Sequence, residues 1–194
     1  MKFRIWLYSA IAIAMTIFQG CALKPQYLLI DPTIQVKDSS VGNGFEVGLS
    51  VADLRPDRKL GDVGDPNKEL VEVRLDKDPS PAMYARIKDA LMRQGFGVVP
   101  YVSGQTRTLH IEIRNLTLTS IKKPLIFDTE LRAEVTAHAV NGGTRHDRQF
   151  NVRTRKEGAI PPYEKDSNVL VNDAISQALN DLVVDDQVLA VLAQ

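Results

Sequence analysis

The chain has 194 residues, of which 44% are hydrophobic, and its 24 basic and 24 acidic side chains give a formal net charge of zero. This length fits a single domain with tails, and the apolar content is sufficient for an ordinary core. The balanced charge excludes the large basic footprint of a nucleic-acid-binding protein, so we expect no nucleic acid among its partners.

Residues 1–20 have the pattern of a secretory signal peptide. Lys2 and Arg4 precede an apolar run over residues 5–18, and the small residue Gly20 follows it. A helix of that length spans about 21 Å, which is shorter than the roughly 30 Å hydrocarbon core of a bilayer. We therefore predict a cleaved signal peptide over residues 1–20 rather than a permanent membrane span.

The only cysteine, Cys21, stands at the predicted cleavage site, in the sequence Phe18-Gln19-Gly20-Cys21. This pattern resembles the lipobox of bacterial lipoproteins, in which the cysteine is acylated and becomes the new N-terminus, although Phe18 and Gln19 depart from the usual residues. The alternative is an ordinary signal with an incidental cysteine. We predict lipid attachment at Cys21, including palmitate, because two or three acyl chains anchor a protein stably. Ala22, in place of the Asp of an inner-membrane retention signal, favours the outer membrane.

The sequence after Cys21 divides into a tether and one domain. Residues 21–44 are rich in Pro, Ser and Gly, and we expect them to form the lipidated N-terminus and a tether, within which 27–30 and 33–36 could form short strands. Residues 45–194 form the predicted periplasmic domain. Since Cys21 would be acylated, no disulfide can form, and the core alone must stabilise this domain.

The first half of the domain predicts a hairpin, a helix and a strand. Apolar residues alternate over 45–55 and again over 70–76, which predicts two paired strands joined by a long loop. Residues 80–95 form an amphipathic pattern, with Ser80 as the expected N-cap, Pro81 in the first turn and Gly95 as the C-cap. Residues 96–101 follow as a short strand.

The second half predicts three strands and a helix. The apolar parity changes within 107–121, which predicts a β-bulge near Arg114–Asn115. Strands 129–140 and 144–155 flank Asn141-Gly142, and a two-residue turn there places Ala133 opposite Phe150. Residues 167–193 are helical, with a break at Asp185-Asp186.

These elements predict an α+β fold. We expect a single domain in which a mostly antiparallel sheet carries two main helices on one face and exposes its charged face to water.

The histidines do not predict a metal site, and we expect no cofactor. The chain has His110, His138 and His146, and the predicted register pairs His138 with Arg145 and His146 with Ala137. His138 and His146 then lie on opposite faces of the sheet, where they cannot share a metal ion.

No catalytic residue is predicted either. Motifs of serine hydrolases, zinc peptidases and P-loop enzymes are missing, and aromatic residues, which a glycosidase cleft needs as platforms, make up only 6% of the chain. We therefore expect a protein that is not an enzyme. The alternative is a periplasmic ligand-binding or hydrolytic domain, which an apolar pocket between helices and sheet would favour.

One cluster of basic residues allows two interpretations. It comprises Arg145, Arg148, Arg153, Arg155 and Lys156. The cluster could bind anionic lipid or lipopolysaccharide phosphates. We favour a solvated strand face paired with carboxylates, because the predicted register places Glu130 opposite Arg153.

Several short motifs, in this order, resemble the YajG family of Gram-negative lipoproteins. They are the lipobox Cys21, Val51-Ala52-Asp53-Leu54-Arg55, RQGFGVV at 93–99, Asn141-Gly142, Glu157-Gly158-Ala159 and VNDAISQALNDLVVDD at 171–186. The resemblance spans nearly all of the mature chain. It implies a domain anchored to the outer membrane that faces the periplasm and has no established activity.

The resemblance also makes Asp53 and Arg55 candidates for a weak interaction site. The alternative that we favour is an ion pair at the strand end that holds the following loop. The sequence as a whole predicts a non-catalytic interaction or scaffold module of the envelope, bound to the membrane through Cys21 and to an unidentified envelope protein. An accessory role in lipid transport or outer-membrane assembly is a narrower form of this hypothesis.

Overall fold

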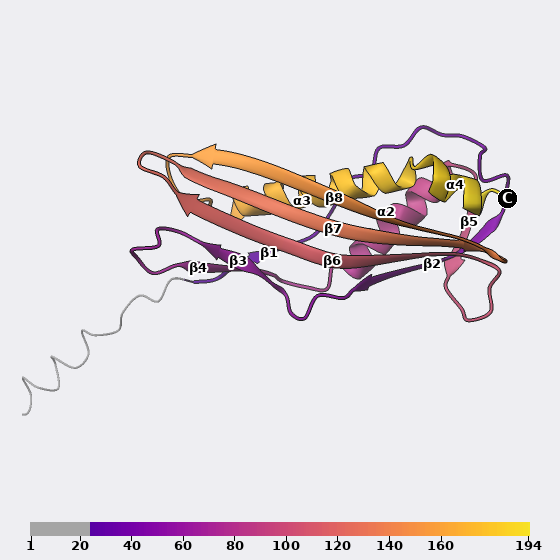
Figure 1. Ribbon diagram of the computed structural model, residues 1–194, viewed down its shortest axis with the longest axis horizontal. Helices are drawn as coiled ribbons and strands as arrows, with labels where there is room; N and C mark the ends of the chain where they lie inside the picture. The colour runs from indigo at the N-terminus through magenta and orange to yellow at the C-terminus, as the bar shows by residue number, and fades with distance from the viewer. Residues whose placement is uncertain (1–23) are drawn as a thin grey trace, which may run out of the picture.

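The computed structural model describes residues 24–194, which form three helices and eight strands (Figure 1). The predicted signal peptide and Cys21 lie outside these residues. Within the described part of the chain, no helix is both long and apolar enough to cross a membrane.

The larger sheet has five strands in the order β5-β2-β6-β7-β8. β2 pairs in parallel with both β5 and β6, whereas β6, β7 and β8 are antiparallel neighbours, so the sheet is mixed. The strand bounds are β2 (Glu46–Asp53), β5 (Gly97–Pro100), β6 (Arg107–Lys122), β7 (Phe127–Asn141) and β8 (Thr144–Gly158).

A second sheet of three strands replaces the hairpin that was predicted between 45–55 and 70–76. Its order is β1-β4-β3, with bounds β1 (Gln26–Leu28), β3 (Lys59–Val63) and β4 (Val71–Leu75). β3 forms within the stretch that was expected to be loop, and it pairs with β4. The prediction that 45–55 pairs with 70–76 is wrong, because β2 has hydrogen-bonded neighbours on both edges and leaves no edge for β4.

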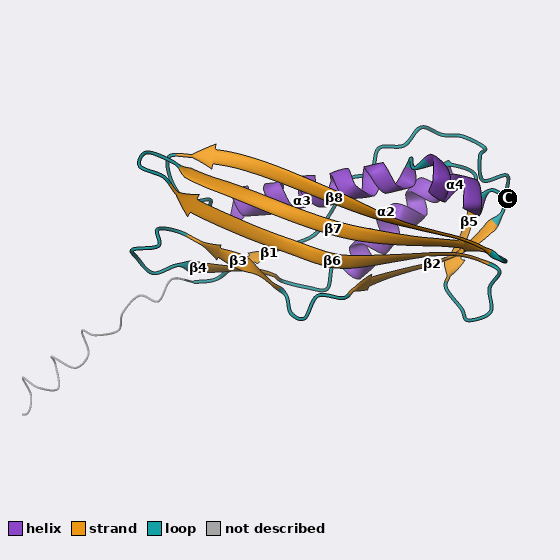
Figure 2. Cartoon of the chain, in the orientation of Figure 1, coloured by secondary structure: helices purple, strands orange, loops and turns teal. Residues whose placement is uncertain are grey.

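Two helices cover one face of the larger sheet and leave the other face open. Figure 2 shows α2 (Ser80–Arg93) and α3 (Glu164–Val183) behind the sheet, with the short α4 (Asp186–Leu192) at the end of α3. The inward side chains of both sheets and all three helices form one buried apolar cluster. The predicted α+β single domain with two helices on one face is confirmed, and its sheets are mixed: the long pairings are antiparallel, and the shorter ones of β1, β2 and β5 are parallel.

Local signals at the helix ends are partly confirmed. Gly95 ends α2 with φ +87°, a conformation that glycine adopts without strain. Ser80 lies inside the helix and is not its cap; the carboxylate of Asp78 accepts the Ser80 N–H at 2.9 Å. Asp185 caps α4 by accepting from the N–H groups of Gln187 and Val188, which confirms the predicted break.

The predicted bulge in β6 is confirmed. The register between β6 and β7 shifts between Ile113 and Asn115, with Arg114 as the extra residue. β2 accompanies β6 up to Ile113, and β3 approaches β6 beyond the bulge. A Cβ on Gly61 of β3 would lie 2.0 Å from the carbonyl oxygen of Leu118, so only glycine permits this approach of the two sheets.

The β7–β8 register differs from the predicted one by two residues. The loop is Gly142-Gly143 rather than Asn141-Gly142, so Ala133 faces Val152 and not Phe150. Gly142 adopts φ +57° at the first loop position. Asn141 stays in the strand, where its side-chain N–H donates to the Val191 carbonyl at 3.2 Å. A shift of two residues preserves strand parity, so the predicted inward and outward faces are unchanged.

Of the predicted segments, the tether expected at residues 21–44 differs most from what the structure shows. Gln26 begins β1, and the following segment, residues 29–36, runs extended along α3. Side chains one helical turn apart on α3 accept from every second backbone N–H of this segment, at 2.7–2.9 Å. The pairs are Asn168 to Leu29, Asn172 to Asp31, Ser176 to Thr33 and Asn180 to Gln35.

Matching repeat lengths explain this ladder of hydrogen bonds. Four helical residues advance about 6 Å, and two extended residues advance about 6.2–6.6 Å, so the two chains stay in step over several turns. Ile30 and Pro32 alternate with the bonded residues and are buried. Residues 26–36 are therefore part of the folded domain.

We predict that Asn172→Ala lowers the free energy of unfolding by about 1–2 kcal/mol. Its side chain accepts from Asp31 and donates to the Leu29 carbonyl, and the substitution removes both bonds. Urea unfolding measures the loss, and amide exchange at Asp31 should accelerate. Gln177→Ala, at an exposed position of the same helix, is the control and should change stability by less than about 0.5 kcal/mol. Equal effects of the two substitutions would contradict the ladder's contribution.

Candidate functional site

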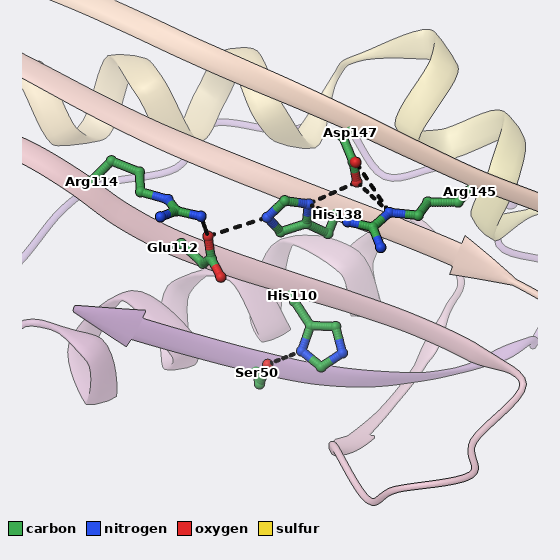
Figure 3. A network of polar contacts seen from close by, with 7 residues as sticks. All are labelled: Ser50, His110, Glu112, Arg114, His138, Arg145 and Asp147. Atoms are coloured by element: carbon green, nitrogen blue, oxygen red, sulfur yellow. Dashed lines mark hydrogen bonds and ion pairs between the residues drawn. The ribbon is translucent and has the colours of Figure 1, made fainter. Parts of the chain in front are cut away.

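The open face of the five-stranded sheet carries a transverse row of polar side chains. The strand registers place Ser50 beside His110, His110 beside His138, and His138 beside Asp147. The row therefore crosses β2, β6, β7 and β8 in sequence (Figure 3). Each member has the parity opposite to the buried apolar residues of its own strand, which is why all four point away from the helices.

The row consists of two hydrogen-bonded pairs. Ser50 Oγ lies 2.5 Å from His110 Nδ1, and the Tyr101 ring meets the His110 ring edge-on at 4.2 Å between centroids. His138 Nδ1 lies 2.7 Å from Asp147 Oδ1, and its Nε2 lies 3.2 Å from Glu112 Oε2. His138 is thus held between two carboxylates from the strands on either side.

Two arginines complete the network around His138. Arg145 Nε donates to Asp147 Oδ1 at 2.9 Å, and Arg114, the extra residue of the bulge, forms an ion pair with Glu112. Figure 3 shows these side chains converging on His138 from β6 and β8. Arg114 continues the outward parity of His110 and Glu112, and the bulge lets Leu116 and Leu118 turn inward beyond it.

A concave surface of about 520 Å³ lies over this network. Side chains from β6 and β7 form its floor, and Tyr101 and Gln105 of the β5–β6 loop contribute to its lining. Most of its lining is polar. Such a surface fits a polar or charged ligand or a hydrophilic protein surface better than an apolar small molecule.

Burial and neighbouring charge shift two pKa values in the row. Partial burial, and the proximity of His138, lower the pKa of His110 below its ordinary value of 6.5. The hydrogen bonds from Arg145 and then His138 lower the pKa of the Asp147 carboxyl. His110 is therefore held neutral and Asp147 ionised near neutral pH.

The arrangement lacks the third group of a hydrolytic triad. A catalytic serine needs a histidine that a carboxylate orients through its second ring nitrogen. In the described part of the chain, the hydrogen-bonded carboxylates contact His138, and His110 has only Ser50 as its hydrogen-bond partner. Residues 24–194 also hold no group of three His, Cys, Asp or Glu side chains arranged to bind a metal ion.

The predicted ion pair of Asp53 and Arg55 is confirmed. Arg55 Nε and Nη2 donate to the two carboxylate oxygens of Asp53 at 2.8 and 2.6 Å, and the Arg55 side chain is only 5% exposed. The pair lies where β2 ends and directs the chain toward β3. An interaction role for these two residues stays a prediction.

The basic cluster of β8 is paired with carboxylates, as we favoured. Its members contact acidic side chains of α3, β7, β8 and the α3–α4 junction. The pairs are Arg145 with Asp147, Arg148 with Asp185, Arg153 with Glu130, Arg155 with Asp128 and Lys156 with Asp166. A separate basic surface for lipid phosphates is therefore not formed by these residues.

Sequence reasoning placed His138 and His146 correctly on opposite faces but missed the row. It did not pair β6 with β7, so the neighbours His110 and His138 remained unconnected. The signal was present, because both histidines have the polar parity of their strands. Matching the apolar stripes of β6 and β7 would have placed both histidines on the open face, although it does not determine the register that makes them neighbours.

A family model of lipoproteins covers most of the chain. The chain matches the family model Lipoprotein_16, described as uncharacterized lipoprotein, over residues 32–193. The chain belongs to this family of YajG-type lipoproteins, which confirms the resemblance noted in the sequence. No curated protein sequence matches the chain.

Solved structures with related topology are only distantly similar. A DUF330-family protein from Xanthomonas campestris is 13% identical, with a TM-score of 0.45, and the alignment covers 88% of this chain and 95% of that one. A minor lipoprotein from Acinetobacter baumannii is 12% identical, with a TM-score of 0.35 and coverage of 76% and 90%. Similarity at this level establishes no function.

We predict that acid destabilises the protein through His110. Its folded pKa lies below the unfolded value of about 6.5, so stability is highest above that pH and falls as pH drops from about 6.5 toward the folded pKa. His110→Gln removes this contribution. The melting temperature, measured at about pH 7.5 and 5.5, should therefore fall further in the wild type than in the variant. An equal fall in both proteins would contradict the assignment.

Proposed function

We propose that this chain is an outer-membrane lipoprotein, anchored through Cys21 and facing the periplasm, that acts by binding an envelope protein rather than by catalysis. Family membership supports the lipoprotein character. Anchoring to the outer membrane, the periplasmic orientation and the non-catalytic role are parts of the proposal. An accessory role in lipid transport or outer-membrane assembly is its narrower form.

The observation that carries the proposal is the uncovered polar face of the five-stranded sheet. Helices pack on the other face, whereas this face is open and is concave around His110 and His138. Its side chains are held in place by mutual hydrogen bonds. A preorganised polar surface loses little conformational entropy when a partner binds.

The packing between helices and sheet also favours binding at the surface. The alternative function, that of a ligand-binding or hydrolytic domain, would place a ligand between the helices and the sheet. There, Met83, Ile87, Ala174 and Leu179 are each no more than 2% exposed and belong to the continuous buried cluster. Such close packing supports a scaffold whose outer faces carry the function.

We predict that a photoreactive amino acid at position 149 captures the partner in intact cells. Gln149 is exposed on the open face of β8, where it is the next outward residue after Asp147, the partner of His138. The same label in place of Val169, which is 48% exposed on α3, is the matched control. Irradiation should give a discrete protein adduct from position 149 and none from position 169, as seen on immunoblots and identified by mass spectrometry. Adducts from position 169 alone would refute the open face as the binding surface.

We predict that Cys21→Ser abolishes anchoring. Without the thiol, no thioether to diacylglycerol forms, so the precursor should remain uncleaved or the protein should leave the membrane fraction. Metabolic labelling with radioactive palmitate should mark the wild type and not the variant. A wild-type protein that takes up no palmitate would refute lipidation.

A further inference from the structure

One end of the molecule gathers exposed apolar side chains from three loops. It comprises the β6–β7 turn (123–126), the β3–β4 loop (64–70) and the segment after β8 (159–163), which lie together at the end of the long strands (Figure 1). We call this the turn end. Leu125, at the tip of the β6–β7 turn, is 87% exposed, and Ile160 and Tyr163 are 55% and 66% exposed.

The β6–β7 turn presents Leu125 as a projection. The Lys123 N–H donates to the Ile126 carbonyl at 2.7 Å, which closes the turn around Pro124 and Leu125. Proline restricts the backbone of this tip. A single exposed leucine would be ordinary, but Leu125 shares this end of the molecule with the exposed Ile160 and Tyr163, and a gathering of exposed apolar side chains marks a contact surface.

A shallow groove of about 750 Å³ adjoins this tip at the turn end. Val63, Val71, Phe127 and Pro162 contribute apolar surface, and Tyr163 stands at its rim. More of the lining is apolar than polar. Tyrosine is enriched where proteins meet the headgroup region of a bilayer, because its ring is apolar and its hydroxyl is polar.

The beginning of the folded chain is fixed at the same end. Gln26 lines the groove, and its side-chain N–H donates to the Pro162 carbonyl at 2.9 Å. Its side-chain oxygen accepts from Ser167 at 2.8 Å. Only four residues separate Gln26 from Cys21, and their full extension spans at most about 18 Å. A lipid on Cys21 therefore brings the turn end to the bilayer surface.

Most of the lysine charge at the turn end is balanced by carboxylates, including Glu69 next to Lys68 in the sequence. Lys122 pairs with Asp65, and Lys123 lies 2.8 Å from Asp128. Little uncompensated positive charge remains to attract anionic lipid. Contact between this end and a bilayer would therefore depend on apolar burial, which salt does not screen.

We propose that the turn end docks on the phospholipid bilayer, with Leu125 inserted into the boundary between headgroups and acyl chains. This inference rests on the proposed anchoring through Cys21. The lipid anchor holds the turn end near the bilayer, and the inserted apolar tip orients the domain on it. The long strands then rise from the membrane, and the open sheet face is held at a defined angle to it.

A single environment-sensitive fluorophore tests the docking in the full, lipidated protein. Because acylation consumes the Cys21 thiol, Leu125→Cys introduces a unique labelling site at an exposed position. Val102→Cys is the matched control. It is 63% exposed at the opposite end of β6, about 50 Å away along its 16 residues. Both proteins are purified after acylation is verified by mass and are reconstituted into phosphatidylcholine vesicles.

The label at position 125 should emit at shorter wavelength and be quenched by nitroxide-bearing lipid, both at low and at high salt. The label at position 102 should behave as it does in water. A lipidated, vesicle-bound protein whose label at 125 stays in water overturns docking but preserves the anchor, and assigns the apolar tip to a protein contact. An unacylated mass refutes the anchor and the docking together. Insertion that disappears at high salt also overturns the proposal.

Discussion

The continuous apolar face of the three long strands is the constraint on which the rest of the molecule depends. β6, β7 and β8 run 15–16 residues each and turn Leu131, Val135, Phe150 and their neighbours toward the same side. Burying so long a stripe requires a cover of similar length. α3, with 20 residues, spans about 30 Å and provides most of it; α4 covers a further part, while α2 packs on β2 and β5.

The same constraint decides where function can reside. Since the helices occupy one face, the other face remains available, and its polar row faces solvent. The strand length also separates the β5–β6 loop from the β6–β7 turn by about 50 Å. The proposed partner binding and the proposed membrane contact therefore use different places on the domain.

Features that depend on the alternation of inward and outward side chains along a strand could be predicted from the sequence. Alternation alone identified the inward faces of β6, β7 and β8, and the change of parity located the bulge at Arg114. The cap at Gly95 and the helix break at Asp185-Asp186 depend on residues within a few positions, so both were visible locally. The opposite faces of His138 and His146 followed from the same rule.

Properties that depend on the choice of a distant partner could not be predicted. Nothing local to Lys59–Val63 indicates that it pairs with β4, and nothing local to β2 indicates two parallel neighbours. The ladder along α3 joins residues about 140 positions apart, and its asparagines resemble ordinary polar surface in the sequence. The neighbouring positions of His110 and His138 likewise arise from a pairing that only the folded sheet establishes.

The two-residue difference in the β7–β8 register has a consequence for folding specificity. Both registers bury the same apolar side chains, so hydrophobic burial discriminates poorly between them. They differ in the polar pairs: one sets His138 opposite Arg145, and the other sets it opposite Asp147, within reach of Glu112. The contacts of His138 with Asp147 and Glu112 therefore stabilise the observed register relative to an alternative that buries the same apolar side chains.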